Sequence, residues 1–295
     1  MKTNGIKAKH VYSEKKQIAV YLKKDDNKWS PINFQLIPIV KLNTGLNLKT
    51  NKMKNLLTIA LMVLIIFAAS SCSTDDDCIF GSGTVTTQTI PLESFSGIQS
   101  SGSDSVIISQ GDVQEVTVTG HPNIISRLKR NVSNGIWKAE LEDGCYENSD
   151  LVIHIKVPNM NYVKLAGSAN AVINDFINQQ NMEIRIEGSA SFELNNNQGT
   201  QNLDISIEGN GYVVGNGSFE NLEYLDIQIF GSGYYNAFSI ETNSCSIYTE
   251  GSGYCNVFVN DNLDVIINGS TEVNYKGYPT ITSNISGSGS INNAN

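Results

Sequence analysis

The chain has 295 residues, of which 40% are hydrophobic and 17% are charged. Its 20 basic and 29 acidic side chains are unevenly distributed: residues 72–295 hold 8 of the basic and 26 of the acidic ones, a net charge of −18. We expect no nucleic-acid partner, because binding a phosphate backbone needs a basic surface. High negative charge fits solubility outside the cell, or the recruitment of cations.

Residues 53–71 have the layout of a secretory signal peptide, with a basic start, an apolar centre and small residues at the end. The sequence Ala69-Ser70-Ser71-Cys72 resembles the lipobox of bacterial lipoproteins, which implies cleavage before Cys72 and diacylation of that cysteine. A transmembrane anchor is the alternative, although the uncharged run over residues 55–71 is only marginally long for a span. We therefore predict contact with a membrane through a lipid anchor on Cys72.

The predicted signal peptide leaves no place for residues 1–52, because such a peptide must be N-terminal. We interpret residues 1–52 as a mis-called, disordered extension and Met53 as the start of the protein. A genuine cytoplasmic segment before an uncleaved anchor is the alternative.

Residues 72–80 are predicted to form a lipidated tether. The acidic run Ser73-Thr74-Asp75-Asp76-Asp77 resembles the surface-export signal of Bacteroidetes lipoproteins. The alternative is a solvated tether whose charge only keeps it off an anionic membrane. The predicted location is the outer membrane, at the cell surface, with the periplasmic face as the alternative.

The folded body is predicted to span residues 81–295, and its first part has only a weak repeat. One or two helical turns are expected within residues 123–131. Strands are expected over residues 105–108, 115–118, 136–141 and 151–157. Irregular coils at the end of a solenoid are normal, because they have to cover the core.

From Leu165 onward the chain repeats one phrase seven times: an alternating apolar strand, a glycine and then a small residue. The repeat glycines, 18 to 22 residues apart, are Gly167, Gly188, Gly209, Gly231, Gly251, Gly269 and Gly287. This period, combined with strand-type alternation, is typical of a stacked β-solenoid. We predict an all-β, right-handed parallel β-helix with coils of about 18–22 residues.

Alignment on the glycines indicates which side chains point inward. Residues two, four and six positions before a glycine are apolar, as in Met182, Ile184 and Ile186, whereas those between them are mostly polar. Such alternation gives a strand with one buried and one wet face. Each glycine is expected at a corner that needs positive φ or close backbone approach, and a second short strand follows it.

Four cysteines remain besides Cys72, and an exported chain permits disulfides among them. Cys78, Cys145, Cys245 and Cys255 allow three pairings. Cys245 and Cys255 both occupy inward positions of one repeat, so buried free thiols and a disulfide between them fit equally well. Their spacing is not that of a zinc site, and no metal is expected.

No arrangement of side chains indicates catalysis. His121 and His154 lack a neighbouring carboxylate and nucleophile, and no Lys-Ser/Thr of a phosphate loop follows the Gly-Ser-Gly phrases. Glu187 and Glu208 are expected to stack on adjacent coils as solvated side chains. We therefore predict no enzyme, no catalytic residue and no cofactor.

One outward position is more suggestive of binding. The residue three positions after the glycine is tyrosine in three consecutive repeats, Tyr212, Tyr234 and Tyr254, and Asn236 and Asn256 flank it. Aromatic faces beside amide groups suit sugar rings or a protein partner. The alternative is that the stacked rings only stabilise the coils.

Several phrases carry a family resemblance. They are Phe95-Ser-Gly-Ile with Val106-Ile-Ile, Val116-Thr-Val-Thr-Gly-His-Pro-Asn-Ile-Ile, Leu151-Val-Ile-His-Ile-Lys-Val-Pro followed by Val163-Lys-Leu-Ala-Gly-Ser-Ala, and the repeated Gly-Ser-Gly. Over residues 97–292 the chain resembles the putative auto-transporter adhesin, head GIN domain family, although that family usually has an acidic pair where His121-Pro122 stands. The resemblance implies an exported, often lipidated Bacteroidetes protein with a β-helical fold, an adhesive role and no catalytic residues.

These observations favour a surface lipoprotein whose rigid, acidic β-helix binds a glycan or an extracellular protein. A non-catalytic envelope scaffold, which stabilises the outer membrane or assembles through an exposed solenoid end, is the second hypothesis. A polysaccharide-active enzyme is the third, because lyases of this shape need clustered carboxylates beside an arginine or lysine base.

Overall fold

The computed structural model describes residues 7–13, 16–25, 28–31, 78–220 and 222–295. The chain divides into two compact units, Met1–Cys72 and Ser73–Asn295, which are treated separately. The predicted signal peptide, Cys72 and the acidic run lie outside the described residues.

The first unit contains a small antiparallel sheet. Its strands are β1 (Lys7–Ser13), β2 (Lys16–Asp25) and β3 (Lys28–Pro31), with β2 in the centre. The sequence predicts no ordered structure over residues 1–52, and the sheet is a difference from that expectation. β-Branched and aromatic residues such as Val11, Ile18 and Tyr21 favour strands, which gives the sheet a local cause.

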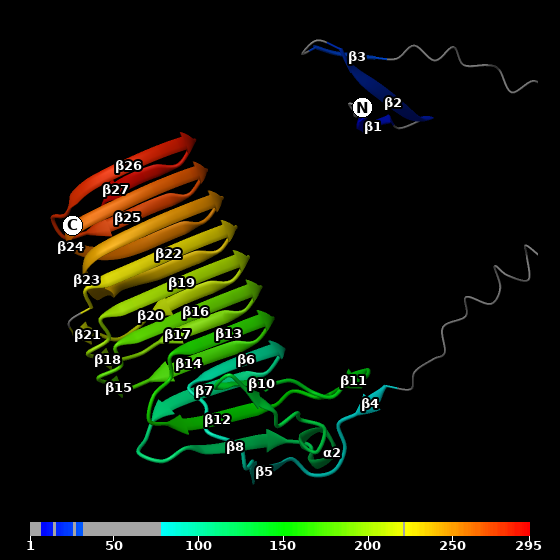
Figure 1. Ribbon diagram of the computed structural model, residues 1–295, viewed down its shortest axis with the longest axis vertical. Coiled ribbons are helices and arrows are strands. Elements are labelled where there is room, and N and C mark those ends of the chain that lie inside the picture. Colours follow the sequence, from blue (N-terminus) through cyan, green and yellow to red (C-terminus); the bar gives the residue numbers. More distant parts are fainter. Residues whose placement is uncertain (1–6, 14–15, 26–27, 32–77, 221) are drawn as a thin grey trace, which may run out of the picture. The chain divides into compact units, whose positions relative to one another are not determined.

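The second unit is a parallel β-solenoid, so the predicted parallel β-helix is confirmed (Figure 1). In each coil a long strand ends at a repeat glycine, and a shorter strand follows the corner. The long strands pair in register to form what we call the long ladder: β13 (Tyr162–Gly167), β16 (Asn181–Gly188), β19 (Asn202–Gly209), β22 (Tyr224–Gly231), the second parts of β23 (Tyr234–Gly251) and β24 (Tyr254–Gly269), and β26 (Thr280–Gly287).

The shorter strands form the short ladder on the other side of the core. It consists of β14 (Asn170–Asn174), β17 (Ser191–Leu194), β20 (Tyr212–Gly215), the first parts of β23 and β24, β25 (Glu272–Lys276) and β27 (Ser290–Asn293). A third, very short side was not predicted: β15 (Phe176–Ile177), β18 (Asn197–Gln198) and β21 (Phe219–Glu220).

The core lies between the ladders as columns of stacked apolar side chains. Ile184, Ile205 and Ile227 are direct ladder neighbours on consecutive coils, and each is at most 2% exposed. Burying one isoleucine side chain contributes about 1.5–3 kcal/mol. Repetition of these columns along the axis is therefore the main source of stability.

All seven predicted corner glycines have positive φ, between 75° and 143°. A second constraint comes from stacking: a Cβ on Gly251 would lie 2.0 Å from the carbonyl oxygen of Gly231 on the preceding coil. Gly102, with φ of 109°, pairs with Gly167 and begins the same column, although the sequence repeat does not include it. Glycine is required here by conformation and by space.

The N-terminal end of the solenoid is closed by a segment that folds back on itself. The first regular coil consists of β6 (Gly97–Gly102) and β7 (Ser105–Gln110). On one side, β6 pairs with β10 (Ile136–Ala139) and β7 pairs with β12 (Val152–Val157). On the other side, β6 pairs with β13 and β7 with β14, which form the next coil. The strands β10 and β12 follow β6 and β7 in sequence, yet they form a coil on the N-terminal side of the coil that β6 and β7 make (Figure 1).

Antiparallel strands and one helical turn complete this cap. β8 (Glu115–Gly120) pairs antiparallel with β12 on one side and with β5 (Thr86–Thr89) on the other. Helix α2 (Pro122–Ile125) is the predicted helical turn and buries Ile124 and Ile125 completely, while β9 (Val132–Ser133) pairs with β10. The cap covers the first end of the apolar columns.

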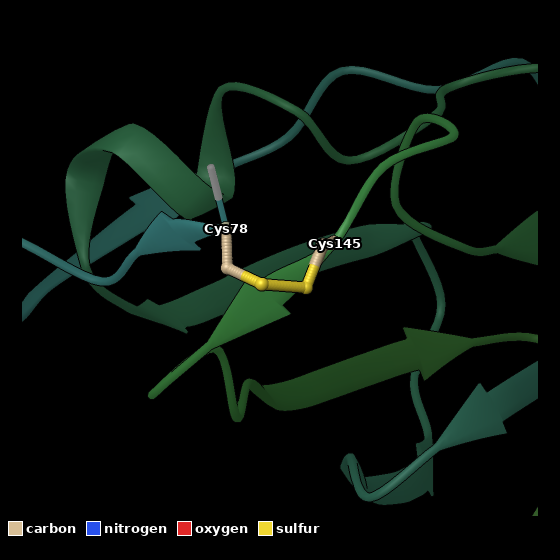
Figure 2. Close-up of a disulfide and its surroundings, with 2 residues drawn as sticks. All are labelled: Cys78 and Cys145. Carbon is tan, nitrogen blue, oxygen red and sulfur yellow. A yellow bond between two sulfur atoms is a disulfide. The ribbon is translucent and has the colours of Figure 1, made fainter. Parts of the chain in front are cut away.

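A disulfide fastens the start of the body to the cap. Cys78 is bonded to Cys145, and the adjacent strands β4 (Ile79–Phe80) and β11 (Tyr146–Glu147) pair in parallel (Figure 2). Residues 78–80 therefore belong to the folded body, and the tether predicted over residues 72–80 ends before Cys78. The sequence left this pairing open.

The other two cysteines are free thiols in the core. Burial raises the pKa of Cys255 to about 12 and the pKa of Cys245 well above its usual range. The sequence left open whether Cys245 and Cys255 are free thiols or form a disulfide, and the structure shows buried free thiols. They act as small apolar side chains and are unreactive, because the thiolate is strongly disfavoured.

Candidate binding surface

The outward side of the short ladder carries three columns of side chains over its C-terminal coils. Counted from each repeat glycine, the first column stands at position three, the second at position five and the third at position seven. We call this surface the three-column face; it consists of Tyr212, Tyr234, Tyr254, Asn236, Asn256, Asn274, Phe238, Phe258 and Lys276.

The first column consists of the three predicted tyrosines on consecutive coils. The ring centroids of Tyr212 and Tyr234 are 5.0 Å apart with an interplanar angle of 5°, and those of Tyr234 and Tyr254 are 4.7 Å apart at 10°. Packing between its neighbours desolvates the Tyr234 phenol and, with a smaller effect of the neighbouring phenols, raises its pKa. The rings thus form one continuous stack.

Stacking changes what the tyrosines can offer a ligand. Both faces of the Tyr234 ring are covered by Tyr212 and Tyr254, so the expectation of open aromatic faces is wrong for this residue. The stack presents ring edges and a row of phenol hydroxyls about one coil spacing apart. Such a row suits hydrogen bonding to a ligand that repeats at a similar distance.

The second column is an amide ladder. Asn256 Nδ2 donates to Asn236 Oδ1 at 2.9 Å, and Asn274 Nδ2 donates to Asn256 Oδ1 at 3.0 Å. Asn292 continues the ladder at 3.1 Å from Asn274 Oδ1. Asn236 and Asn256 were predicted as ligand groups, but the side-chain oxygen of each already accepts a bond between coils, and Asn256 also donates one.

The third column was missed by the sequence analysis. Phe258 and Lys276 are direct ladder neighbours, whereas Phe238 has the same count from its glycine but lies where the register between β23 and β24 shifts. All three side chains are half-buried. Lys276 Nζ lies 4.8 Å from the centroid of the Phe238 ring, a cation–π contact. The face therefore combines hydroxyls, amides, apolar rings and one cation.

The outward side of the long ladder is acidic instead. Glu183, Asp204 and Asp226 are direct neighbours on consecutive coils, and burial, then Asp226 and Glu183, raise the pKa of Asp204. Glu187 stacks on Glu208 as predicted, but it is also paired with Lys164, whose Nζ is 2.6 Å from Glu187 Oε1. Within the described residues, no group of three acidic, histidine or cysteine side chains is arranged to hold a metal ion.

His121 has a structural position in the cap. Its Nδ1 lies 2.8 Å from the carbonyl oxygen of Gly83, so Nδ1 carries the proton and donates it. Nε2 then accepts from Asn148 Nδ2 at 3.0 Å. Both ring nitrogens are engaged in contacts that join loops of the cap.

These coils and columns define a β-solenoid protein with a polar and aromatic face. A family model described as "Putative auto-transporter adhesin, head GIN domain" matches residues 94–279. The match covers more than half of the chain, and the chain belongs to this family. The resemblance seen in the sequence is thereby confirmed.

Solved structures from Bacteroidetes have the same fold. A putative adhesin from Bacteroides fragilis is 20% identical, with a TM-score of 0.64 over 73% of this chain and 99% of that one. From Parabacteroides distasonis, a putative lipid binding protein (24% identity, TM-score 0.62) and a putative adhesin (18%, 0.61) each match over 74% of this chain and 100% of their own. At these identities the likeness establishes the fold alone.

None of the curated proteins matches the chain. Over the part of the chain that the structure describes, no helix is both long and apolar enough to cross a bilayer.

Proposed function

We propose that the protein is a non-enzymatic adhesion module, exported and held at the outer surface of the outer membrane by a lipid on Cys72. Membership of an adhesin-type family supports the binding role. The lipobox-like sequence and the acidic run that follows it support the anchor and the surface location.

The observation that carries the binding role is the three-column face. Its hydroxyl row, amide ladder and apolar rings lie on a rigid ladder, so a ligand meets preorganised groups at little cost in ordering. Three hydroxyls in register suit an extended glycan or a strand-like protein segment. The first column ends at Glu272, which follows Tyr254 on the next coil and accepts a hydrogen bond from Asn292 Nδ2 at 3.0 Å. We infer that this face binds an extracellular polymer.

The disulfide also supports an orientation. Cys72 is six residues before Cys78, so the two are at most about 20 Å apart along a fully extended chain. Because Cys78 is bonded to the cap, the capped end would stand close to the membrane. The solenoid axis then carries the three-column face and the open end away from the lipid.

A screen of glycans and matrix proteins with purified residues 73–295 tests the binding role. Changing Tyr212, Tyr234 and Tyr254 together to Phe keeps the stack and removes the hydroxyls, and we expect at least tenfold weaker binding. Tyr224→Phe is the matched control, because Tyr224 is 59% exposed on the long ladder. Unchanged binding of the triple variant would exclude the hydroxyl row as the site.

Location is tested separately from binding. Protease added to intact cells should degrade the protein if it is displayed at the surface, and protection until the outer membrane is opened would favour the periplasmic scaffold. Cys72→Ser should abolish lipid labelling and release the protein from the membrane fraction.

Depolymerisation of a polysaccharide by the purified solenoid would revive the enzyme hypothesis.

A further inference from the structure

The C-terminal end of the solenoid is open. In the described part of the chain, β26 pairs with β24 alone and β27 with β25 alone, so each has one free edge (Figure 1). Ile281 and Ile285 occupy inward positions that are fully buried one coil earlier, yet they are 38% and 41% exposed. The apolar columns therefore reach solvent at this end.

The open end also carries no charged side chain. Residues 277–295 contain no Asp, Glu, Lys or Arg, whereas residues 81–295 as a whole have 8 basic and 23 acidic side chains, a net charge of −15. Free edge strands are usually protected by charged side chains, proline or bulges. Within Thr280–Gly287 none of these occurs, and the register with β24 is regular. This edge is open to pairing, and two acidic molecules can approach each other here.

We propose that this end binds a second copy of the chain, end to end, about a two-fold axis through Ser283. In an antiparallel pair centred on Ser283, Ile281 lies opposite Ile285 of the partner subunit. Because side chains alternate, both then point to the inside, and the two cores join. An isologous contact of this kind is closed and stops at a dimer.

A second copy fits this end better than a single peptide. β26 and β27 are two free edges on either side of one apolar opening. A peptide strand can pair with one of these edges and leaves the isoleucines half-covered, whereas a copy supplies two edges and its own isoleucines. Extending both ladders also satisfies both rows of free backbone groups.

The consequence for adhesion rests on the proposed function. A two-fold axis perpendicular to the solenoid places the two capped ends, with their anchors, at opposite ends of the dimer. Two copies on one membrane face the same way and cannot meet in this manner. The dimer would thus bridge two cells that display the same protein.

Sedimentation velocity of residues 73–295 over a wide concentration range measures the dimer. These residues hold the entire described core, and solved relatives consist of this region alone, so the fragment folds by itself. We expect Ile285→Lys to weaken dimerisation at least tenfold. Ile266→Lys is the control, since Ile266 is 43% exposed on the outward side of β24. A wild-type monomer up to millimolar concentration, or equal effects of both variants, overturns the proposal.

Crosslinking tests the position of the axis. The Ser283→Cys variant should form a disulfide between the substituted positions of two copies under mild oxidation, because residues opposite each other on the axis have Cα atoms about 4.5–5.5 Å apart. Ser246→Cys, exposed two coils away, should dimerise without forming the crosslink, and the buried Cys245 and Cys255 do not interfere. Crosslinking by both variants to the same extent would overturn the axis.

Bridging is tested with beads of two colours that carry the protein through a biotin at residue 73. Mixed clusters are expected with the wild-type protein and not with Ile285→Lys. Dimers in solution without bead clusters would overturn the bridging role but leave the contact intact. Because biotin replaces the lipid, this result is independent of whether Cys72 is acylated in the cell.

Discussion

The apolar core is covered at the N-terminal end of the solenoid and partly exposed at its C-terminal end. At the N-terminal end the apolar columns are covered by antiparallel strands, one helical turn and a disulfide, all supplied by an irregular segment. At the C-terminal end the last coil repeats the regular pattern, and Ile281 and Ile285 are left partly exposed. Each regular coil only has to match its two neighbours, whereas a terminal segment needs a sequence of its own to cover the core.

Loss of the disulfide should have the largest effect, and this effect should be confined to the capped end. Changing Cys78 and Cys145 together to Ser opens a loop closed across 67 residues, which should lower the free energy of unfolding by about 4 kcal/mol. Urea unfolding followed by circular dichroism measures it. The double change of Cys245 and Cys255 to Ala is the control, because these thiols are not bonded. A loss below about 1 kcal/mol would show that the cap does not depend on the bond.

The glycine column allows a comparison of its first position, Gly102, with an interior position, Gly251. Gly251→Ala places a Cβ 2.0 Å from a carbonyl oxygen at φ of 138°, whereas a Cβ on Gly102 meets nothing within 4 Å. We expect about 1–2 kcal/mol for Gly102→Ala from the backbone conformation alone, and about 3 kcal/mol or more for Gly251→Ala. Thermal unfolding of both variants checks this. Equal losses would mean that stacking adds nothing to the conformational requirement.

Asp104 should make the capped end sensitive to pH. Burial, reinforced weakly by Asp150 and opposed by the N–H of Leu151 at 3.1 Å, raises the pKa of Asp104 from 3.8 to about 6. Because the pKa of Asp104 is higher in the folded than in the unfolded state, the stability that Asp104 contributes is fully present below about pH 4 and is lost as the pH rises through about 6. Asp104→Asn should therefore raise the free energy of unfolding by about 3 kcal/mol at pH 8 and leave it nearly unchanged at pH 4.

Urea titrations of this variant and the wild type at both pH values measure that difference. Asp150→Asn is a useful companion, since its neighbour's charge is a minor cause of the shift. A stabilisation by Asp104→Asn that is the same at pH 4 and pH 8 would contradict the assignment.

The smallest predicted effect compares the middle of the core with its open end. Ile227→Val removes a methyl group from a fully buried column and should cost about 1 kcal/mol. Ile285→Val removes the same group where the side chain is 41% exposed, and the loss should be within about 0.5 kcal/mol. Measurement has to be made at micromolar concentration and below, so that dimerisation does not bury Ile285. A loss as large as that of Ile227→Val in the monomer would show that the end is covered from within the chain.

The regular part of the fold could be predicted because its sequence signal is strictly local. Each coil has its own alternating strand and its own glycine, so the register of Tyr212, Tyr234 and Tyr254 follows from counting. The cap could not be predicted in this way. β6 is stacked on β10 and β13, which are separated from it by long stretches of chain, and Ser100 stands where later repeats have an apolar residue.

The candidate site was predicted in its residues but not in its chemistry. Counting from the glycines brings the tyrosines together, yet it does not say that the rings lie parallel and cover each other's faces. It also gives no sign that Asn236 and Asn256 bond to one another rather than to a ligand. Side-chain orientation depends on packing with the neighbouring coils, which the sequence pattern does not contain.

The position of β6 and β7 has a consequence for the order in which the chain can fold. As the chain is made from N to C, β6 has neither of its two lateral neighbours until β10 and then β13 have been synthesised. Cys78 likewise waits for Cys145 before it can be oxidised. The first coil therefore has to wait for residues as far as Gly167 before both of its edges are paired, whereas each later coil can stack on the coil that precedes it.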